Sequence, residues 1–150
     1  MKIFWASDHA GFNHKNELIN FWKVQFPSDQ LIDIGPFSTE STDYSEWAIL
    51  LCKRLLEDIS SSQRGVLICG SGIGMSMAAN RFSKIRAALC RSEEDARLSR
   101  EHNDANVICL GARATPLDQA KKILSIWRAS DYAGGRHQQR IERFDHLGSC

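Results

Sequence analysis

Residues 65–80 read GVLICGSGIGMSMAAN, and the rest of the chain can be interpreted around this stretch. A β-prone apolar run ends on Cys69, three alternating glycines follow, and small and apolar residues with good helix propensity come next. This pattern predicts a buried strand, a tight loop and a helix. Because backbone N–H groups are accessible in such a loop at a helix N-terminus, the stretch is a natural anion site with a thiol at its rim.

Apolar strands and amphipathic helices alternate along the whole chain. Strands are expected at residues 2–6, 31–34, 66–69, 85–90 and 107–111. Helices are expected at residues 15–23, 47–59, 74–82, 92–101 and 117–127, with a last amphipathic helix carrying Ile141, Phe144 and Leu147. The alternation predicts one Rossmann-like α/β domain over residues 1–150, with a five-stranded parallel sheet flanked by helices and a C-terminal helix.

Two helix starts carry local signals. The segment from Ser92 to Asp95 has the character of a capping box. Thr115 followed by Pro116 predicts an N-cap with proline at the first helical position.

The composition restricts the class of protein. The 150 residues suit one domain with a sizeable core, and the formal net charge of +1 favours neither nucleic acid nor a membrane surface as a partner. No apolar run is long enough to span a bilayer, and the N-terminus lacks the apolar region of a signal peptide. The five cysteines are odd in number and form no C-x-x-C pair, which argues against a disulfide framework and a structural zinc site. A cytoplasmic protein is expected.

The glycine loop at residues 70–74 has the pattern G-x-G-x-G. It is neither the dinucleotide motif G-x-G-x-x-G nor a Walker A loop, so a tight turn and an anion site stay open as alternatives. For Cys69, a buried inert thiol and a reactive thiol are both reasonable, because a helix N-terminus can lower a thiol pKa from its usual ~8.5 toward neutrality.

Two histidine clusters accompany this loop. Asp8 and His9 follow the first strand, and His102, Asn103 and Asp104 follow the fourth helix. We expect both clusters at the edge of the sheet where the strands end, where ligands bind in such folds. Asp8, His9, His102 and Asp104 could be imagined around a metal, but their spacing supports no metal site and none is expected.

A set of cations could hold an anion. Arg136 and Arg140 lie one helical turn apart, and guanidinium groups suit phosphate. The full set is Arg113, Arg136, His137 and Arg140. A solvated helix face is the alternative interpretation of such scattered charges.

Together these motifs resemble the ribose-5-phosphate isomerase B family, which also contains the galactose-6-phosphate isomerase subunits. The similarity rests on segments in family order from residue 8 to residue 140: DHAGF at 8–12, TDY at 42–44, CGSGIG at 69–74, AANR at 78–81, IRAA at 85–88, LSREHNDANV at 98–107 and GGRHQQR at 134–140. The resemblance implies a cofactor-free aldose–ketose isomerase acting on ribose 5-phosphate, and a Rossmann-like homodimer or dimer of dimers with the active site between subunits.

The resemblance also implies roles for single residues. Cys69 matches the base that moves a proton between C1 and C2, Ser71 matches a hydroxyl that assists it, and His102 matches the residue that assists ring opening. The residues that match the sugar-binding group are Asp8, His9, Tyr44 and Asn103, and those that match the phosphate-binding group are Arg113, Arg136, His137 and Arg140. The amides of Gly70, Gly72, Ile73 and Gly74 are expected to stabilise the enediolate oxygen.

Two other functions stay open from the sequence. One is an isomerase of a six-carbon substrate, such as allose 6-phosphate or galactose 6-phosphate. The other is a non-catalytic sensor of sugar phosphates or nucleotides on the same fold, although a binder needs no base such as Cys69.

Overall fold

The computed structural model describes residues 1–57 and 63–146. Its strands are β1 (Lys2–Ser7), β2 (Gln30–Gly35), β3 (Gln63–Cys69), β4 (Ala87–Leu89) and β5 (Val107–Gly111). Its helices are α1 (Phe12–Gln25), α2 (Tyr44–Leu56), α3 (Ile73–Ala79), α4 (Glu93–Glu101), α5 (Leu117–Ala129) and α6 (Gln138–Glu142), with 3₁₀ turns η1 (Gly135–His137) and η2 (Arg143–His146) around α6.

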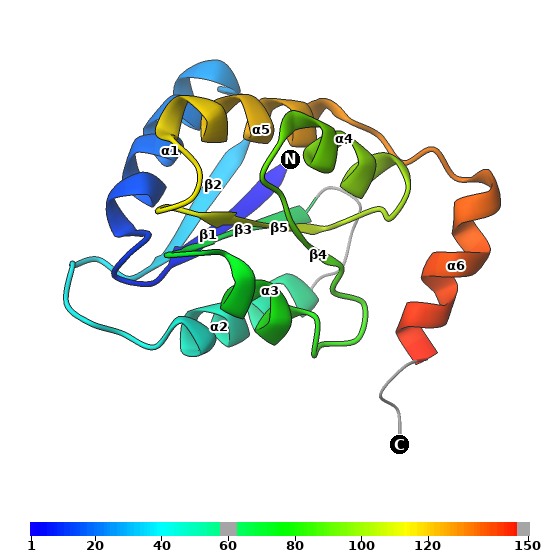
Figure 1. Cartoon of the computed structure of the whole chain (residues 1–150), viewed down its shortest axis with the longest axis horizontal. Coiled ribbons are helices and arrows are strands. Elements are labelled where there is room, and N and C mark those ends of the chain that lie inside the picture. Colours follow the sequence, from blue (N-terminus) through cyan, green and yellow to red (C-terminus); the bar gives the residue numbers. More distant parts are fainter. Residues whose placement is uncertain (58–62, 147–150) are drawn as a thin grey trace.

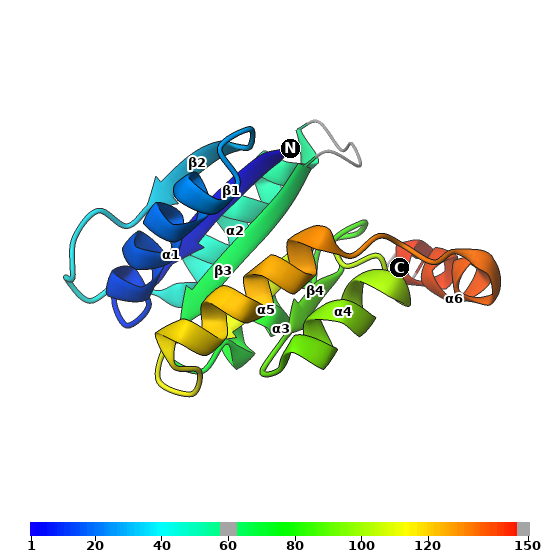
Figure 2. The same cartoon turned by 90° about the horizontal axis from the view of Figure 1, so that it is seen from above.

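The five strands form one sheet in the order β2-β1-β3-β5-β4, and every strand pair is parallel. Helices α1, α4 and α5 cover one face of the sheet, and α2 and α3 cover the other (Figure 1). The short helix α6 stands apart, beyond the edge of the sheet formed by β4 (Figure 2). The predicted Rossmann-like α/β fold with five parallel strands is therefore confirmed.

The core consists of two apolar layers, one on each face of the sheet. Alternate residues of β1 show why, because Trp5 faces α1 and α5 while Phe4 and Ala6 face α2 and α3. The central strand β3 is buried along its whole length, as expected for a parallel strand covered on both faces. Among the described residues, no helix is long and apolar enough to cross a membrane.

The prediction of a strand from residue 85 to residue 90 is wrong at its ends. β4 has only three residues, and the backbone around it is held by asparagine side chains. Asn80 makes two hydrogen bonds to the main chain of Ala87, at 2.8 and 2.9 Å, and the Asn106 carboxamide accepts from the amide of Arg86 at 2.8 Å. These side chains take the place of strand partners at the edge of the sheet.

Helix ends match the predictions in one case and differ in others. The capping box is confirmed, because Ser92 Oγ accepts from the amide of Asp95 and the Asp95 carboxylate accepts from the amide of Ser92. The Thr115 cap is wrong: Pro116 occupies the cap position, and Thr115 Oγ1 is buried without a hydrogen-bond partner. α1 begins at Phe12, earlier than predicted, and α3 ends at Ala79, before the predicted residue 82. The expected helical positions Ile59 and Leu147 lie outside the described residues.

A buried carboxylate connects the N-terminus of the chain with α1 and α5. The side chain of Asp29 is fully buried and accepts hydrogen bonds from the N-terminal ammonium at 3.1 Å, Trp22 Nε1 at 3.0 Å and the Arg128 guanidinium at 2.9 and 3.0 Å. Burial by itself raises the pKa of Asp29, but these donors outweigh it and hold the pKa below its ordinary value of 3.8.

We expect Asp29→Asn to lower the free energy of unfolding by about 2 kcal/mol at pH 7, because a charged acceptor is lost where four donor contacts converge. The depressed pKa in the folded state means that the carboxylate stabilises the fold above its ordinary pKa and loses that effect as the pH falls through the folded-state value. Urea unfolding of both proteins at pH 7 and at about pH 3 measures this difference. A gap that stays constant between the two pH values would contradict the proposed role of the charge.

Candidate active site

The thiol of Cys69 lies at the end of β3, where the strand passes into the glycine loop. Cys69 is only 4% exposed, and the amide of Gly72 donates a hydrogen bond to its Sγ at 3.1 Å. The main-chain carbonyl of Cys69 accepts from the amide of Ala112 at 2.8 Å, so the pairing of β3 with β5 fixes the position of the cysteine. The strand and the loop thus hold the thiol in one place through a main-chain pairing and a hydrogen bond to sulfur.

Gly72 has the backbone conformation that this contact requires. Its φ is +77°, and a Cβ at this position would lie 2.9 Å from the main-chain carbon of Leu110. A side chain is therefore excluded both by the left-handed conformation and by the neighbouring strand. Gly72, the second glycine of the loop, thus supplies the amide that donates to the Cys69 thiol.

An open pocket of about 710 Å³ surrounds the thiol, and we call it the thiol pocket. It is formed at the carboxyl ends of β1, β3 and β5, with contributions from α2 and α3. Its lining consists of Asp8, His9, Ala10, Tyr44, Cys69, Gly70, Ser71, Ile73, Gly74, Met77, Arg113 and Ala114. The structure therefore brings together the predicted residues that follow strand ends.

Close packing places the polar groups of this pocket. Asp8 is buried and accepts from the amide of Gly11 at 2.9 Å. The guanidinium of Arg113 lies against Gly70, where a Cβ would meet Cζ at 3.4 Å. The ring of Tyr44 lies against Gly74, where a Cβ would approach the ring to 2.6 Å. Two glycines of the loop thus make room for side chains of the pocket.

The loop uses two of its own amides internally. The amide of Gly72 donates to Cys69, and the amide of Ile73 donates to Ser71 Oγ at 3.3 Å. Because Ser71 Oγ accepts there, its hydroxyl proton remains able to donate to a substrate oxygen. Two of the amides that were expected to stabilise the enediolate oxygen are therefore already used, because they donate to the Cys69 thiol and the Ser71 hydroxyl.

A second group of predicted residues lies elsewhere in the chain, and we call it the histidine–arginine group. Its members are His102, Asn103, Arg136, His137 and Arg140, and none of them lines the thiol pocket. The rings of His102 and His137 stack with centroids 4.3 Å apart and an angle of 10° between their planes. Arg136 and Arg140 line one common hollow, as their helical spacing predicts. Burial lowers the pKa of His137, and the charges of His102, Arg136 and Arg140 lower it further.

The direction of the chain separates the two groups. Cys69 pairs with Gly111 at the carboxyl end of the sheet, whereas His102 follows α4 and lies before β5 begins at Val107. The five residues of β5, at ~3.3 Å each, place ~15 Å of strand between the two ends. The expectation that both histidine clusters of a chain lie at the carboxyl end of its sheet is therefore wrong. The same separation keeps Asp8 and His9 apart from His102 and Asp104 within one chain. Among the described residues, no group of three His, Cys, Asp or Glu could hold a metal ion.

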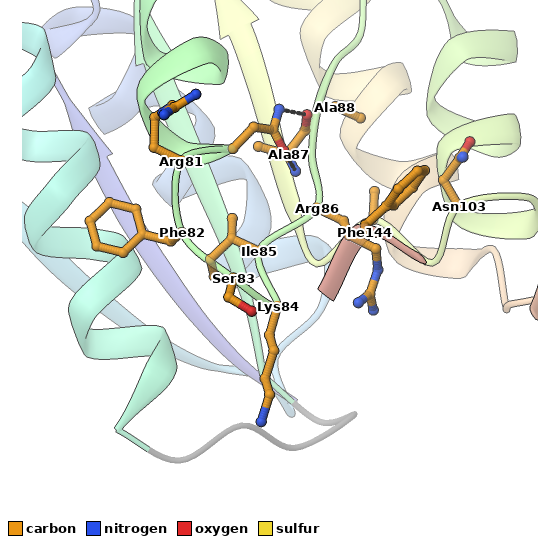
Figure 3. Close-up of a pocket in the computed structure, with 12 residues that line it drawn as sticks. Arg81, Phe82, Ser83, Lys84, Ile85, Arg86, Ala87, Ala88, Asn103 and Phe144 are labelled. Atoms are coloured by element: carbon orange, nitrogen blue, oxygen red, sulfur yellow. Dashed lines mark hydrogen bonds between the residues drawn. The ribbon is translucent and has the colours of Figure 1, made fainter. Parts of the chain in front are cut away.

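Asn103 lines a different pocket, of about 470 Å³, beside the edge strand β4 (Figure 3). The segment 80–88 forms most of its wall, and Asn103, Ala105 and Phe144 complete it. Arg86, in this segment, pairs with Asp104 at 2.7 Å and so connects the pocket wall to the turn that carries His102 and Asn103. This pocket contains no residue of the thiol pocket.

One polar contact at the thiol pocket was not predicted from the sequence. His9 Nδ1 lies 3.2 Å from the amide nitrogen and 3.3 Å from the carbonyl oxygen of Thr42, so the loop between β2 and α2 holds the imidazole. Thr42 belongs to the TDY segment quoted above, but nothing local in the sequence indicates a contact across 33 residues.

Comparison with known proteins shows the family of the chain. The family model described as Ribose/Galactose Isomerase matches residues 3–144. Ribose-5-phosphate isomerase B of Escherichia coli K12 is 41% identical over 141 residues, which cover 94% of this chain and 92% of that protein. The chain belongs to the ribose/galactose isomerase family.

Solved structures support the same family. Ribose-5-phosphate isomerase B of Clostridium thermocellum superposes with a TM-score of 0.92 at 39% identity, covering 98% of this chain and 97% of that one. The Mycoplasma genitalium enzyme, solved with bound ribulose-5-phosphate, gives a TM-score of 0.88 at 35% identity, with 97% and 94% covered. The family resemblance found in the sequence is thus confirmed, and the isomerase fold extends over nearly the whole chain.

Proposed function

We propose that this protein interconverts ribose 5-phosphate and ribulose 5-phosphate by proton transfer. The observation that carries the proposal is the thiol of Cys69, held by the Gly72 amide at the base of an open pocket with Asp8, His9 and Arg113 on its walls. A base beside convergent polar groups fits proton abstraction next to a carbonyl. Family membership supports the same reaction type.

In the proposed reaction, Cys69 as thiolate removes the proton from C2 of the open-chain aldose. The C–H electrons form the C1–C2 double bond, and negative charge moves to the oxygen on C1. The Ser71 hydroxyl and the loop amides that are not used internally donate to this oxygen, and each such donor can contribute about 3 kcal/mol. The thiol then returns the proton to C1, while the proton of the C2 hydroxyl passes to the oxygen on C1. This gives the ketose, with a hydroxyl on C1 and a carbonyl at C2.

We propose further that the histidine–arginine group acts on the thiol pocket of a second copy. Of the predicted phosphate-binding residues, Arg113 lines the thiol pocket of its own chain. His137 stacks on His102, which precedes β5, and Arg136 and Arg140 line a separate hollow. Tyr44, Ile73 and Met77 leave 43%, 44% and 67% of their surface exposed around the pocket, which supports a covering partner. A two-fold homodimer supplies both groups to each of two equal sites, and a dimer of dimers keeps this arrangement.

In this arrangement the second copy would bring His102 to the ring oxygen for opening, and Arg136, His137 and Arg140 to the phosphate. Asn103 would contact the sugar hydroxyls. No step requires a metal or an organic cofactor. The free, buried state of Cys52, Cys69, Cys90 and Cys109 suits a reducing compartment, and we place the enzyme in the cytoplasm.

The deciding experiment is a direct assay of ribose 5-phosphate conversion by the purified protein. We expect turnover with kcat in the common enzymatic range of ~1–10³ s⁻¹. Allose 6-phosphate and galactose 6-phosphate are assayed in parallel, because the family name includes a galactose isomerase. A higher kcat/KM for a six-carbon substrate would change the assigned substrate, and binding without any turnover would favour a sensor.

A further inference from the structure

Lys15 carries a fully buried ammonium group next to the loop that contacts His9. Its Nζ donates to Asp33 Oδ1 at 2.5 Å and to the carbonyl oxygen of Pro36 at 2.9 Å. The rings of Phe12 and Phe37 lie 5.7 and 5.4 Å away from Nζ, within the range of cation–π contacts. A buried charge is costly unless it is paired, so these partners together hold the ammonium in place.

The two hydrogen-bond acceptors of Lys15 lie where β2 passes into the loop between β2 and α2, residues 36–43. Asp33 Oδ1, which takes the Lys15 hydrogen bond, also accepts from the amide of Gly35 at 2.9 Å. One ammonium therefore fixes the last residues of β2 and the first carbonyl of the loop. Burial lowers the pKa of Lys15 below its ordinary value, and the hydrogen bond and charge of Asp33 offset only part of this effect.

The far end of the same loop reaches the thiol pocket. Trp47 Nε1 donates to Thr42 Oγ1 at 3.0 Å, and the main chain of Thr42 meets His9 Nδ1. The Thr42 amide can donate to Nδ1 when this nitrogen is unprotonated, and the Thr42 carbonyl can accept when it is protonated. The ring of His9 thus keeps a partner in either state, with Nε2 as its remaining polar atom.

We propose that Lys15 is a positioning residue for the isomerase site, acting through the 36–43 loop on His9. The ammonium anchors the start of the loop, Trp47 anchors its end, and Thr42 sets the imidazole plane against the thiol pocket. Lys15 itself does not line that pocket. The proposal rests on the proposed function to the extent that His9 contacts the substrate, whereas the hold of Lys15 on the loop does not depend on it.

The test compares Lys15→Met, which keeps the aliphatic length, with Lys15→Arg, which keeps the charge. For Lys15→Met we expect KM for ribose 5-phosphate to rise about tenfold with kcat within ~3-fold, because a contact made equally in the ground and transition states is loosened. Hydrogen exchange at the Thr42 amide should become faster in the same variant. Lys15→Arg should recover part of both effects.

Asp29→Asn is the matched control, because it also removes one partner of a buried charge but lies at the opposite end of β2 from the loop. It should lower stability with KM and Thr42 exchange unchanged. Trp47→Phe loosens the other end of the loop and should raise KM as well, so the proposal remains testable if Lys15→Met fails to fold. An unchanged KM in Lys15→Met or Trp47→Phe, or an equal rise in Asp29→Asn, overturns the positioning role. If the wild-type protein shows no turnover, the proposed function fails, while Thr42 exchange still tests the anchor.

Discussion

Cys69→Ala is expected to lower kcat for ribose 5-phosphate by about 10³-fold, because general-base catalysis contributes ~10²–10⁴ and, among the described residues, Cys69 has the only thiol that lines the thiol pocket. Binding of ribose 5-phosphate should persist, since the groups proposed to hold the sugar and the phosphate are unchanged. Stopped assays of turnover and calorimetric titration with ribose 5-phosphate measure the two properties separately. Retained turnover near the wild-type rate would remove Cys69 from the role of base.

Cys52→Ala is the matched control for the loss of a thiol. Cys52 is fully buried in the layer between the sheet and α2, and burial raises the pKa of its thiol to about 12. It therefore stays protonated at neutral pH, and its replacement should change stability with kcat unaffected. The two variants should differ because the two thiols have different surroundings. A backbone amide donates to Sγ of Cys69, whereas burial alone sets the raised pKa of Cys52.

Mixing two inactive variants is expected to restore about one quarter of the wild-type activity, if each site takes Cys69 from one copy and His102 from the other. Equal amounts of Cys69→Ala and His102→Ala chains are unfolded together and refolded, so that half of the dimers are mixed. Each mixed dimer then has one site with both side chains intact and one site with neither. The assay is the same conversion of ribose 5-phosphate, compared with each variant refolded alone.

The physical reason is the separation found within one chain, where Cys69 lies at the carboxyl end of β3 and His102 precedes β5. A mixture of Cys69→Ala with the double variant Cys69→Ala, His102→Ala is the control, since no pairing in it supplies the thiol. Recovery in that control points to an artefact of refolding. No recovery in the first mixture would show that the two residues do not combine across subunits.

Much of the fold could be predicted because its signals are local. The alternation of buried strands and amphipathic helices sets the parallel sheet, and the capping box at Ser92 fixes the start of α4 within four residues of sequence. The ends of β4 and the cap residue of α5 could not be predicted in this way. Asn80 and Asn106 bind the main chain beside β4, and Thr115 is buried without the capping contact that its position suggests. Each of these outcomes depends on neighbours brought close by folding.

The sequence by itself determined the strand–loop–helix unit at residues 65–80, the thiol at the end of its strand and the family of the chain. These follow from propensity, glycine spacing and the order of motifs, which are properties of neighbouring residues. Only the tertiary structure decided that His102 and the cations near α6 lie apart from Cys69, and that the Gly72 amide donates to its thiol. It also decided that Thr42 contacts His9 and that Lys15 binds the start of the same loop. Such contacts join residues distant in sequence, because each crossover helix carries the chain from the carboxyl end of one strand back to the amino end of the next.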